Sequence, residues 1–171
     1  MSDAPEDTAP PTPGSQAPVT PLRFLGQFIK DLSFEAPHAP EIFNILRQQA
    51  PAIPITIDAN VRQLDGPVFE VTLTVHLEAT VAEKTAFIFE LLYGCVVELN
   101  PEAVPQEYAH SLLLIEVPRY MFPFVRQIVS ETTGSAGFPP LLLQMVDFAD
   151  LYRKKFADAQ AAAADAPAAV H

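Results

Sequence analysis

The stretch from Val68 to Tyr93 restricts the fold more than any other part of the sequence. Apolar and polar residues alternate over 68–81, and this period of two predicts a strand with one buried face and one hydrated face. The apolar positions are Phe69, Val71, Leu73, Val75, Leu77, Ala79 and Val81; the polar positions are Glu70, Thr72, Thr74, His76, Glu78 and Thr80. The chain therefore needs a sheet with at least one covered face.

The second half of this stretch has apolar residues on both faces. One face carries Phe87, Phe89, Leu91 and Tyr93, and the other carries Ala86, Ile88, Glu90 and Leu92. The short connection Ala-Glu-Lys predicts a hairpin between the two halves. Gly94 is expected to end the second strand, with an extension through Leu99 as the alternative. A strand that is apolar on both faces needs a second cover, which is either a helix or another subunit.

Two further strands precede this hairpin. Residues 24–35 place Phe24, Phe28, Leu32 and Phe34 on one predicted face, and Asp31 and Glu35 on the other. Residues 53–64 alternate in the same way, and Asp65-Gly66 supplies a turn into the strand that begins at Val68. Four strands in succession, some of them joined by tight turns, favour an antiparallel sheet.

The period changes to that of a helix after Asn100. Helix-start signals at Asn100 and Pro105 are followed by an apolar stripe, and Pro118 is expected to kink or break the helix. A clean amphipathic stripe then covers 121–129, and Asp147 is expected to cap a last helix. One or two helical turns are also expected within 41–49. Strands first and helices last predict an α+β fold, with the helices on one face of the antiparallel sheet.

Composition narrows the classes of partner. The 171 residues fit one domain, and 21 Asp and Glu against 10 Lys and Arg give a net charge of −11. Such a chain is unsuited to nucleic acid or to an anionic membrane surface, and it attracts basic partners. The single cysteine, Cys95, allows no internal disulfide and is expected to be a small buried residue.

The two ends of the chain differ in composition from its middle. Residues 1–21 are rich in Pro and acidic residues and are predicted to be disordered; residues 157–171 are predicted to be an Ala-rich flexible tail. The domain is expected to cover 22–156. Neither a signal peptide nor a membrane span of roughly 20 apolar residues is recognisable, so a soluble cytoplasmic protein is expected.

The sequence contains no recognisable catalytic motif. The histidines are scattered, glycines form no phosphate-binding loop, and neither a metal nor a cofactor site is expected. We therefore expect no enzyme; Glu70 and Glu78 on one strand are interpreted as solvated carboxylates, with an acid–base pair as the alternative. The surplus apolar surface favours oligomer contacts or partner grooves, unless the helices cover it within one subunit.

Three blocks of sequence resemble the SecB family of protein-export chaperones. The first is KDLSFEAPHAPEIF at 30–43, and the second comprises VFEVTLTV at 68–75 and EKTAFIFEL at 83–91. The third includes Pro118, Phe122-Pro123-Phe124, Arg126, Gly137-Phe138-Pro139-Pro140-Leu141, Val146-Asp147-Phe148 and Leu151-Tyr152. Together they cover residues 22–156, which is the whole predicted domain.

The resemblance implies a four-stranded antiparallel sheet followed by two helices, assembled as a homotetramer that is a dimer of dimers. It implies a chaperone that works without ATP, holds unfolded precursor proteins in apolar grooves and delivers them to the SecA motor. Carried over by position, the SecA-docking residues are Asp31, Glu35, Ile88 and Glu90, and the oligomer-interface residues are Phe89, Leu91 and Tyr93. Candidate groove residues are Leu141, Leu143, Phe148 and Tyr152.

The resemblance leaves two chaperone readings open. The first is a general holding chaperone for export precursors. The second is a SecB-like solitary chaperone dedicated to one partner protein. A third reading, an enzyme or small-molecule carrier that uses Glu70 or Glu78, is the weakest because no motif supports it.

Overall fold

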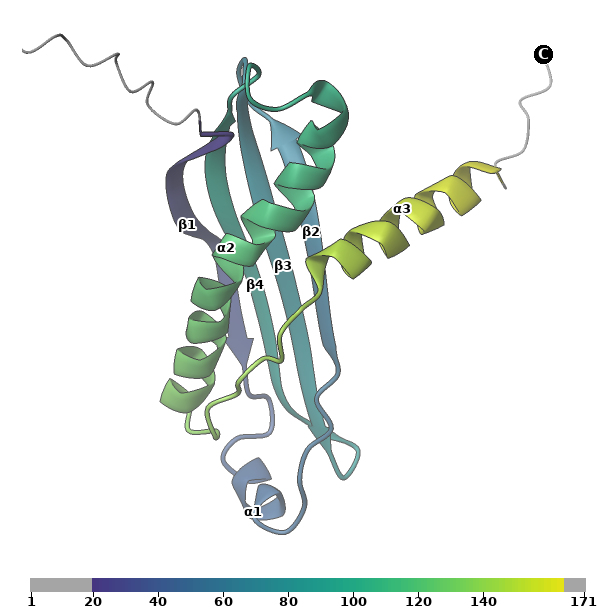
Figure 1. Ribbon diagram of the computed structural model, residues 1–171. Coiled ribbons are helices and arrows are strands. Elements are labelled where there is room, and N and C mark those ends of the chain that lie inside the picture. The colour runs from purple at the N-terminus through teal and green to yellow at the C-terminus, as the bar shows by residue number, and fades with distance from the viewer. Residues whose placement is uncertain (1–19, 165–171) are drawn as a thin grey trace, which may run out of the picture.

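The computed structural model describes residues 20–164, which form one antiparallel sheet and three helices (Figure 1). The strands are β1 (Leu22–Glu35), β2 (Ile55–Gln63), β3 (Val68–Val81) and β4 (Lys84–Leu99). The helices are α1 (Ile42–Leu46), α2 (Gln106–Ser135) and α3 (Phe148–Ala164). The predicted α+β class, the four strands and the short helical segment after β1 are confirmed.

The strands lie in the order β1-β4-β3-β2, and all neighbours are antiparallel. The β3–β4 connection is a two-residue turn in which Ala82 and Glu83 both have positive φ, at 48° and 60°. Turns of this hand match the twist of the strands that they join, which explains the predicted hairpin. β1 and β2 are the edge strands, so each has one side without a partner strand.

One face of the sheet forms the core beneath α2, which Figure 1 shows lying across the strands. The alternating apolar residues of β3 and the odd-numbered residues of β4 point into this core. Its buried members include Val71, Leu73, Val75, Leu77, Phe87, Phe89 and Leu91 from the sheet, and Val117, Met121, Phe122, Val125 and Val129 from α2. α2 therefore covers this face, whereas Ile88, Glu90 and Leu92, on the face for which a second cover was expected, point away from it.

Two irregularities in β1 change which face its residues occupy. The register with β4 shifts between Phe24 and Gly26 and again between Ile29 and Asp31. Each β-bulge adds a residue and reverses the alternation that follows. The expectation that Phe28 shares a face with Phe24 is therefore wrong: Phe24 packs against Tyr120 of α2, whereas Phe28 lies on the opposite face.

β4 is longer than a strand that ends at Gly94. It continues to Leu99, so the extended alternative is the correct one. A Cβ built on Gly94 would lie 2.7 Å from the ring of Phe28, so the missing side chain makes room for an aromatic ring. The following Cys95 is fully buried, as predicted, and burial raises the pKa of its thiol to about 11.

α2 does not break at its prolines. Pro118 and Pro123 both lie inside the continuous helix, which changes direction partway along in Figure 1. Each proline removes one helical hydrogen bond. Burial of Val117, Pro118 and Met121 in the core compensates for that loss, and the helix bends instead of ending.

α3 begins over the sheet and then projects beyond β2 (Figure 1). Asp147 caps it as predicted, since its carboxylate accepts hydrogen bonds from the amides of Ala149 and Asp150 at 3.0 and 3.1 Å. The helix runs to Ala164, into the segment predicted to be flexible. Residues 1–19 and 165–171, which hold most of the first predicted tail and the end of the second, lie outside the described residues. Across 20–164, the helices are too short or too polar to cross a membrane.

Candidate functional site

The face of the sheet opposite α2, here called the open face, brings the four predicted docking residues together. Glu35 is the cross-strand partner of Ile88, and the next pair along, Ser33 and Glu90, continues the same face. Asp31 lies opposite Leu92, one pair further. The second bulge places Asp31 after the register shift, so that it shares the open face with Glu35. Two neighbouring strands thus present three carboxylates around one apolar side chain.

These carboxylates are exposed to solvent, and few positively charged side chains lie near them. Asp31, Glu35 and Glu90 are exposed, and the side chain of Glu90 is 58% accessible. Its one close polar neighbour is Nδ1 of His76, at 3.2 Å from Oε1. Within the part of the chain that the structure describes, Asp31 and Glu35 take part in no ion pair. This end of the open face is therefore acidic, with Ile88 half-buried at its centre.

At the other end of the open face, the charges neutralise one another. Glu70 is buried, and its carboxylate accepts hydrogen bonds from Lys30 at 2.8 Å and from Arg62 at 2.6 Å. These hydrogen bonds, the one from Lys30 foremost, lower the pKa of Glu70 despite its burial. The three residues join β1, β3 and β2 across the sheet. The open face is consequently divided into a paired half and an unpaired acidic half.

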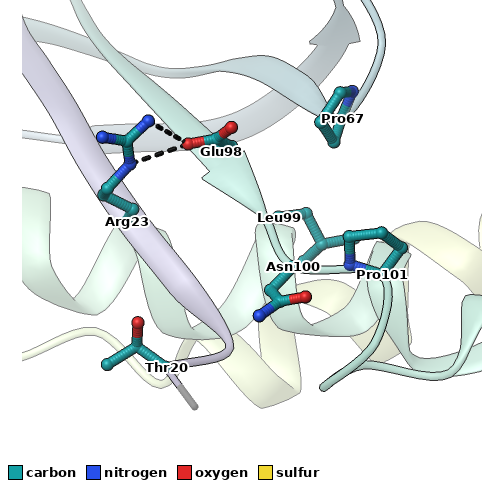
Figure 2. A pocket seen from close by; sticks show the side chains of 7 residues that line it. All are labelled: Thr20, Arg23, Pro67, Glu98, Leu99, Asn100 and Pro101. Carbon is teal, nitrogen blue, oxygen red and sulfur yellow. Dashed lines mark hydrogen bonds and ion pairs between the residues drawn. The ribbon is translucent and has the colours of Figure 1, made fainter. Parts of the chain in front are cut away.

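A small hollow of about 240 Å³ lies beside the start of β1 (Figure 2). Arg23 and Glu98 line it, and Figure 2 shows their ion pair, in which Nε of Arg23 lies 2.7 Å from Glu98 Oε2. The remaining lining residues are Thr20, Pro67, Leu99, Asn100 and Pro101. Because its two charged groups satisfy each other, the hollow presents no free charge to a ligand.

Glu70 and Glu78 do not form an acid–base pair. They are eight positions apart on one straight strand, which separates their Cα atoms by about 26 Å. Glu70 is engaged by two cations, and Glu78 accepts a hydrogen bond of 3.4 Å from Thr85. Within residues 20–164, no group of three or more His, Cys, Asp or Glu side chains is placed to hold a metal ion.

The predicted interface residues are enclosed within a single chain. Phe89 is 0% exposed, Leu91 is 1% exposed and Tyr93 is 7% exposed, and all three lie on the core face of β4. The hydroxyl of Tyr93 donates a hydrogen bond to the side-chain oxygen of Gln27 on β1, at 3.3 Å. These residues therefore affect the shape of the sheet and of edge strand β1 and offer little surface of their own.

The four candidate groove residues do not form one continuous wall. Leu141 lines a cavity of about 270 Å³, and Phe148 lines a separate one of about 480 Å³. Leu143 is 1% exposed and belongs to the core. Tyr152 is half-buried, and its hydroxyl lies 3.2 Å from Nδ1 of His110 on α2. The linker between α2 and α3 thus has an apolar cavity near each of its ends.

An aromatic cluster beside the first cavity was not identified as a site from the sequence. Phe138 lies 4.9 Å from Phe43, 4.9 Å from Phe87 and 5.9 Å from Phe34, measured between ring centroids. The cavity is lined by Leu46, Pro51, Ile53, Phe87, Phe138, Pro139, Pro140 and Leu141. These residues come from three separate segments, 46–53, 87 and 138–141, so no local periodicity links them. Two of the SecB-like sequence blocks, those around Phe87 and Phe138, include residues of this region.

Comparison with known proteins assigns the chain to a family. The family model described as "Preprotein translocase subunit SecB" matches residues 15–159. The protein-export protein SecB of Rhodospirillum rubrum is 46% identical over 94% of this chain and 96% of its own length. That of Gluconacetobacter diazotrophicus is 45% identical over 91% of this chain and 94% of its own length.

A solved structure supports the fold. The Mycobacterium tuberculosis Rv1957 SecB-like chaperone, in complex with a ChAD peptide from the Rv1956 HigA1 antitoxin, matches with a TM-score of 0.59. The match covers 73% of this chain and 90% of that one, at 14% identity. This chain belongs to the SecB family. It is a chaperone of protein export, as the resemblance of its three sequence blocks implied.

Proposed function

We propose that this protein holds unfolded precursor proteins without nucleotide and delivers them to the SecA motor. One observation carries the proposal: the apolar cavities and the acidic half of the open face lie on opposite faces of one sheet. The cavities are lined by core-face and linker residues such as Phe87 and Phe148, whereas Glu35 and Glu90 point the other way. A client and a motor protein can therefore be bound at the same time.

The cavities suit segments of unfolded protein. Their lining is mostly apolar and aromatic, and Met145 and Leu142 add exposed apolar surface on the linker, at 78% and 60% exposure. The first cavity is lined by apolar residues alone, whereas the second also has Arg119 and Arg126 in its lining. A mainly apolar lining discriminates weakly between sequences. Several such contacts along one chain give tight overall binding, because each contact raises the effective concentration of the next.

The acidic half of the open face is the proposed docking surface for SecA. Asp31, Glu35 and Glu90 supply charge that attracts a basic segment, and Ile88 supplies an apolar contact among them. Exposed carboxylates in such an arrangement accelerate association with a positively charged partner and disfavour acidic ones. These carboxylates lie apart from the half of the open face where Glu70 is paired with Lys30 and Arg62, so the negative charge is concentrated at one end of the sheet.

We also propose a homotetramer, built as a dimer of dimers, in the cytoplasm, where precursors await export. The free edge of β1 has no partner strand, and its exposed apolar residues continue onto α2 through the contact of Phe24 with Tyr120. The exposed set is Phe24, Leu25, Ile29, Leu32, Tyr120 and Phe124. Long apolar edges are normally covered, and a second copy is the cover proposed here. Phe89, Leu91 and Tyr93 would influence assembly by shaping the sheet from beneath.

Client holding is tested by a fluorescent reporter in the first cavity. The chain contains no tryptophan, so Leu141→Trp introduces a single probe. Adding an unfolded, tryptophan-free client should shift the emission to the blue, because the indole becomes shielded from water. Leu64→Trp, at the β2–β3 turn, should show no shift. Equal responses at the two positions would contradict the cavity assignment. In a separate pulldown from cells, capture of only one abundant partner would favour the chaperone dedicated to one protein.

A further inference from the structure

Lys155 of α3 contacts several oxygen atoms of edge strand β2. The three N–H groups of its ammonium are shared among four oxygens. These are both carboxylate oxygens of Asp58, at 2.8 and 3.0 Å, and the backbone carbonyl of Ala59 and the side-chain oxygen of Asn60, each at 2.9 Å. One side chain thus binds four oxygens on three consecutive residues of the strand.

The Ala59 carbonyl belongs to the unpaired side of β2. β2 is the last strand of the sheet and pairs only with β3. In an antiparallel strand, the N–H and C=O of one residue point to the same side, and this side alternates along the chain. The amide of Leu64 donates a hydrogen bond to the carbonyl of Val68 at 2.9 Å, so the even-numbered residues face β3. Ile57, Ala59 and Val61 therefore direct their backbone groups away from β3. Lys155 occupies one acceptor in a row that is otherwise available to another strand.

Lys155 is also distinct among the cations of its helix. Arg153 donates to Asp150 and to the carbonyl of Ala149, and Lys154 pairs with Asp150 at 2.8 Å, all within α3. Lys155 alone of these three consecutive residues reaches another element. Nearer its start, α3 is held by Phe148 against Phe122 and by Tyr152 against His110. Lys155 therefore fixes the part of the helix that extends past β2.

We propose that Lys155 is a latch that holds α3 against the free edge of β2, and that release of the latch opens this edge to an extended segment of an unfolded client. The occupant follows from the chemistry of the edge, because backbone groups pair with an extended chain of any sequence. The Asp58 and Asn60 oxygens would then accept a lysine or arginine of the client in place of Lys155. This inference rests on the proposed holding function and adds to it a second, regulated contact surface.

The first test is amide hydrogen exchange on the full-length protein. Lys155→Met should speed exchange in the described part of α3 about five- to tenfold, because the helix loses several charge-assisted hydrogen bonds. Lys154→Met is the matched control, since it removes the same charge from an ion pair internal to α3, and it should leave exchange near wild type. Asp58→Asn, which weakens the latch from the strand side, should act in the same direction as Lys155→Met.

The second test is binding of a permanently unfolded protein, reduced and alkylated α-lactalbumin. Lys155→Met should lower its dissociation constant about threefold or more, whereas Lys154→Met should not. Identical behaviour of the two variants in exchange would overturn the latch, and faster exchange without tighter binding would overturn its control of the edge. If wild type and both variants fail to bind the unfolded protein, the holding function itself is wrong, while the exchange data still decide whether the latch exists.

Discussion

Glu35 on β1 and Ile88 on β4 are direct cross-strand partners on the open face of the sheet. Side chains in this relationship lie about 5 Å apart at Cβ, so a partner that contacts one contacts the other. Glu90 extends the same surface by one residue pair. This arrangement of carboxylates around one apolar group leads to the first prediction.

Reversing the charge of Glu90 should weaken SecA binding and leave client holding intact. Glu90→Lys places a cation among the remaining carboxylates, and the dissociation constant for SecA should rise about tenfold or more at low salt. Asp65→Lys, in the β2–β3 turn, makes the same charge change at the other end of the sheet and should have little effect. Titration calorimetry with SecA provides the measurement. Equal loss of SecA binding and client holding, with assembly preserved, would contradict the docking assignment.

Removing the charge of Glu70 should destabilise the fold at neutral pH. Glu70→Gln leaves Lys30 and Arg62 without their shared carboxylate, and the free energy of unfolding should fall by about 1–2 kcal/mol. The pKa of Glu70 is lowered on folding, so its contribution is complete above the unfolded value of about 4.3 and is lost as the pH falls through the folded pKa.

Urea titrations at several pH values test this sign. The stability difference between wild type and Glu70→Gln should stay constant from pH 6 to 8 and shrink below about pH 4. A difference that grows on acidification would show that the ion pairs do not act as described.

A methyl group at position 94 should displace the ring of Phe28. The built Cβ of Gly94 comes within 2.7 Å of that ring, which is 38% exposed and has room to swing outward. Gly94→Ala should therefore cost only about 1 kcal/mol while exposing Phe28. Gly26→Ala is the matched control on the neighbouring strand, because a Cβ there meets nothing within 4 Å. Thermal unfolding of the two variants should separate them; equal stability would contradict the contact.

The β3–β4 turn should be improved by residues suited to its backbone. Ala82 and Glu83 both have positive φ, which Asn and Gly adopt more readily. The double substitution Ala82→Asn and Glu83→Gly should stabilise the protein by about 1 kcal/mol in chemical denaturation. The reverse choice, Glu83→Val, should destabilise it, because a β-branched residue opposes this conformation.

The central hairpin could be predicted because the pattern that specifies it lies within one short stretch of sequence. Every second residue of β3 is apolar, and α2 covers those residues in the structure. The faces of β1 could not be predicted in full, because two bulges reverse its alternation and depend on pairing with β4. Asp31 and Glu35 were nevertheless placed on one face correctly, because both follow the second bulge.

Tertiary packing explains the other differences between the predicted and the observed structure. Pro118 opposes a helix locally, but it is buried within α2, and this burial keeps the helix continuous. Gly94 resembles a strand end until Phe28, far away in sequence, is placed over it. The aromatic cluster around Phe138 and the contact of Lys155 with Asp58 join distant segments, and neither leaves a periodic signal in the sequence.

The most direct measurement is the refolding of a slow-folding precursor. The precursor is unfolded chemically and diluted into buffer without nucleotide, with and without an equimolar amount of this protein, and recovery of its native signal is followed. We expect refolding to stall in the presence of the chaperone and the held precursor to be released on addition of SecA. Refolding at an unchanged rate would contradict the holding function, and the apolar surface would then serve only contacts between subunits.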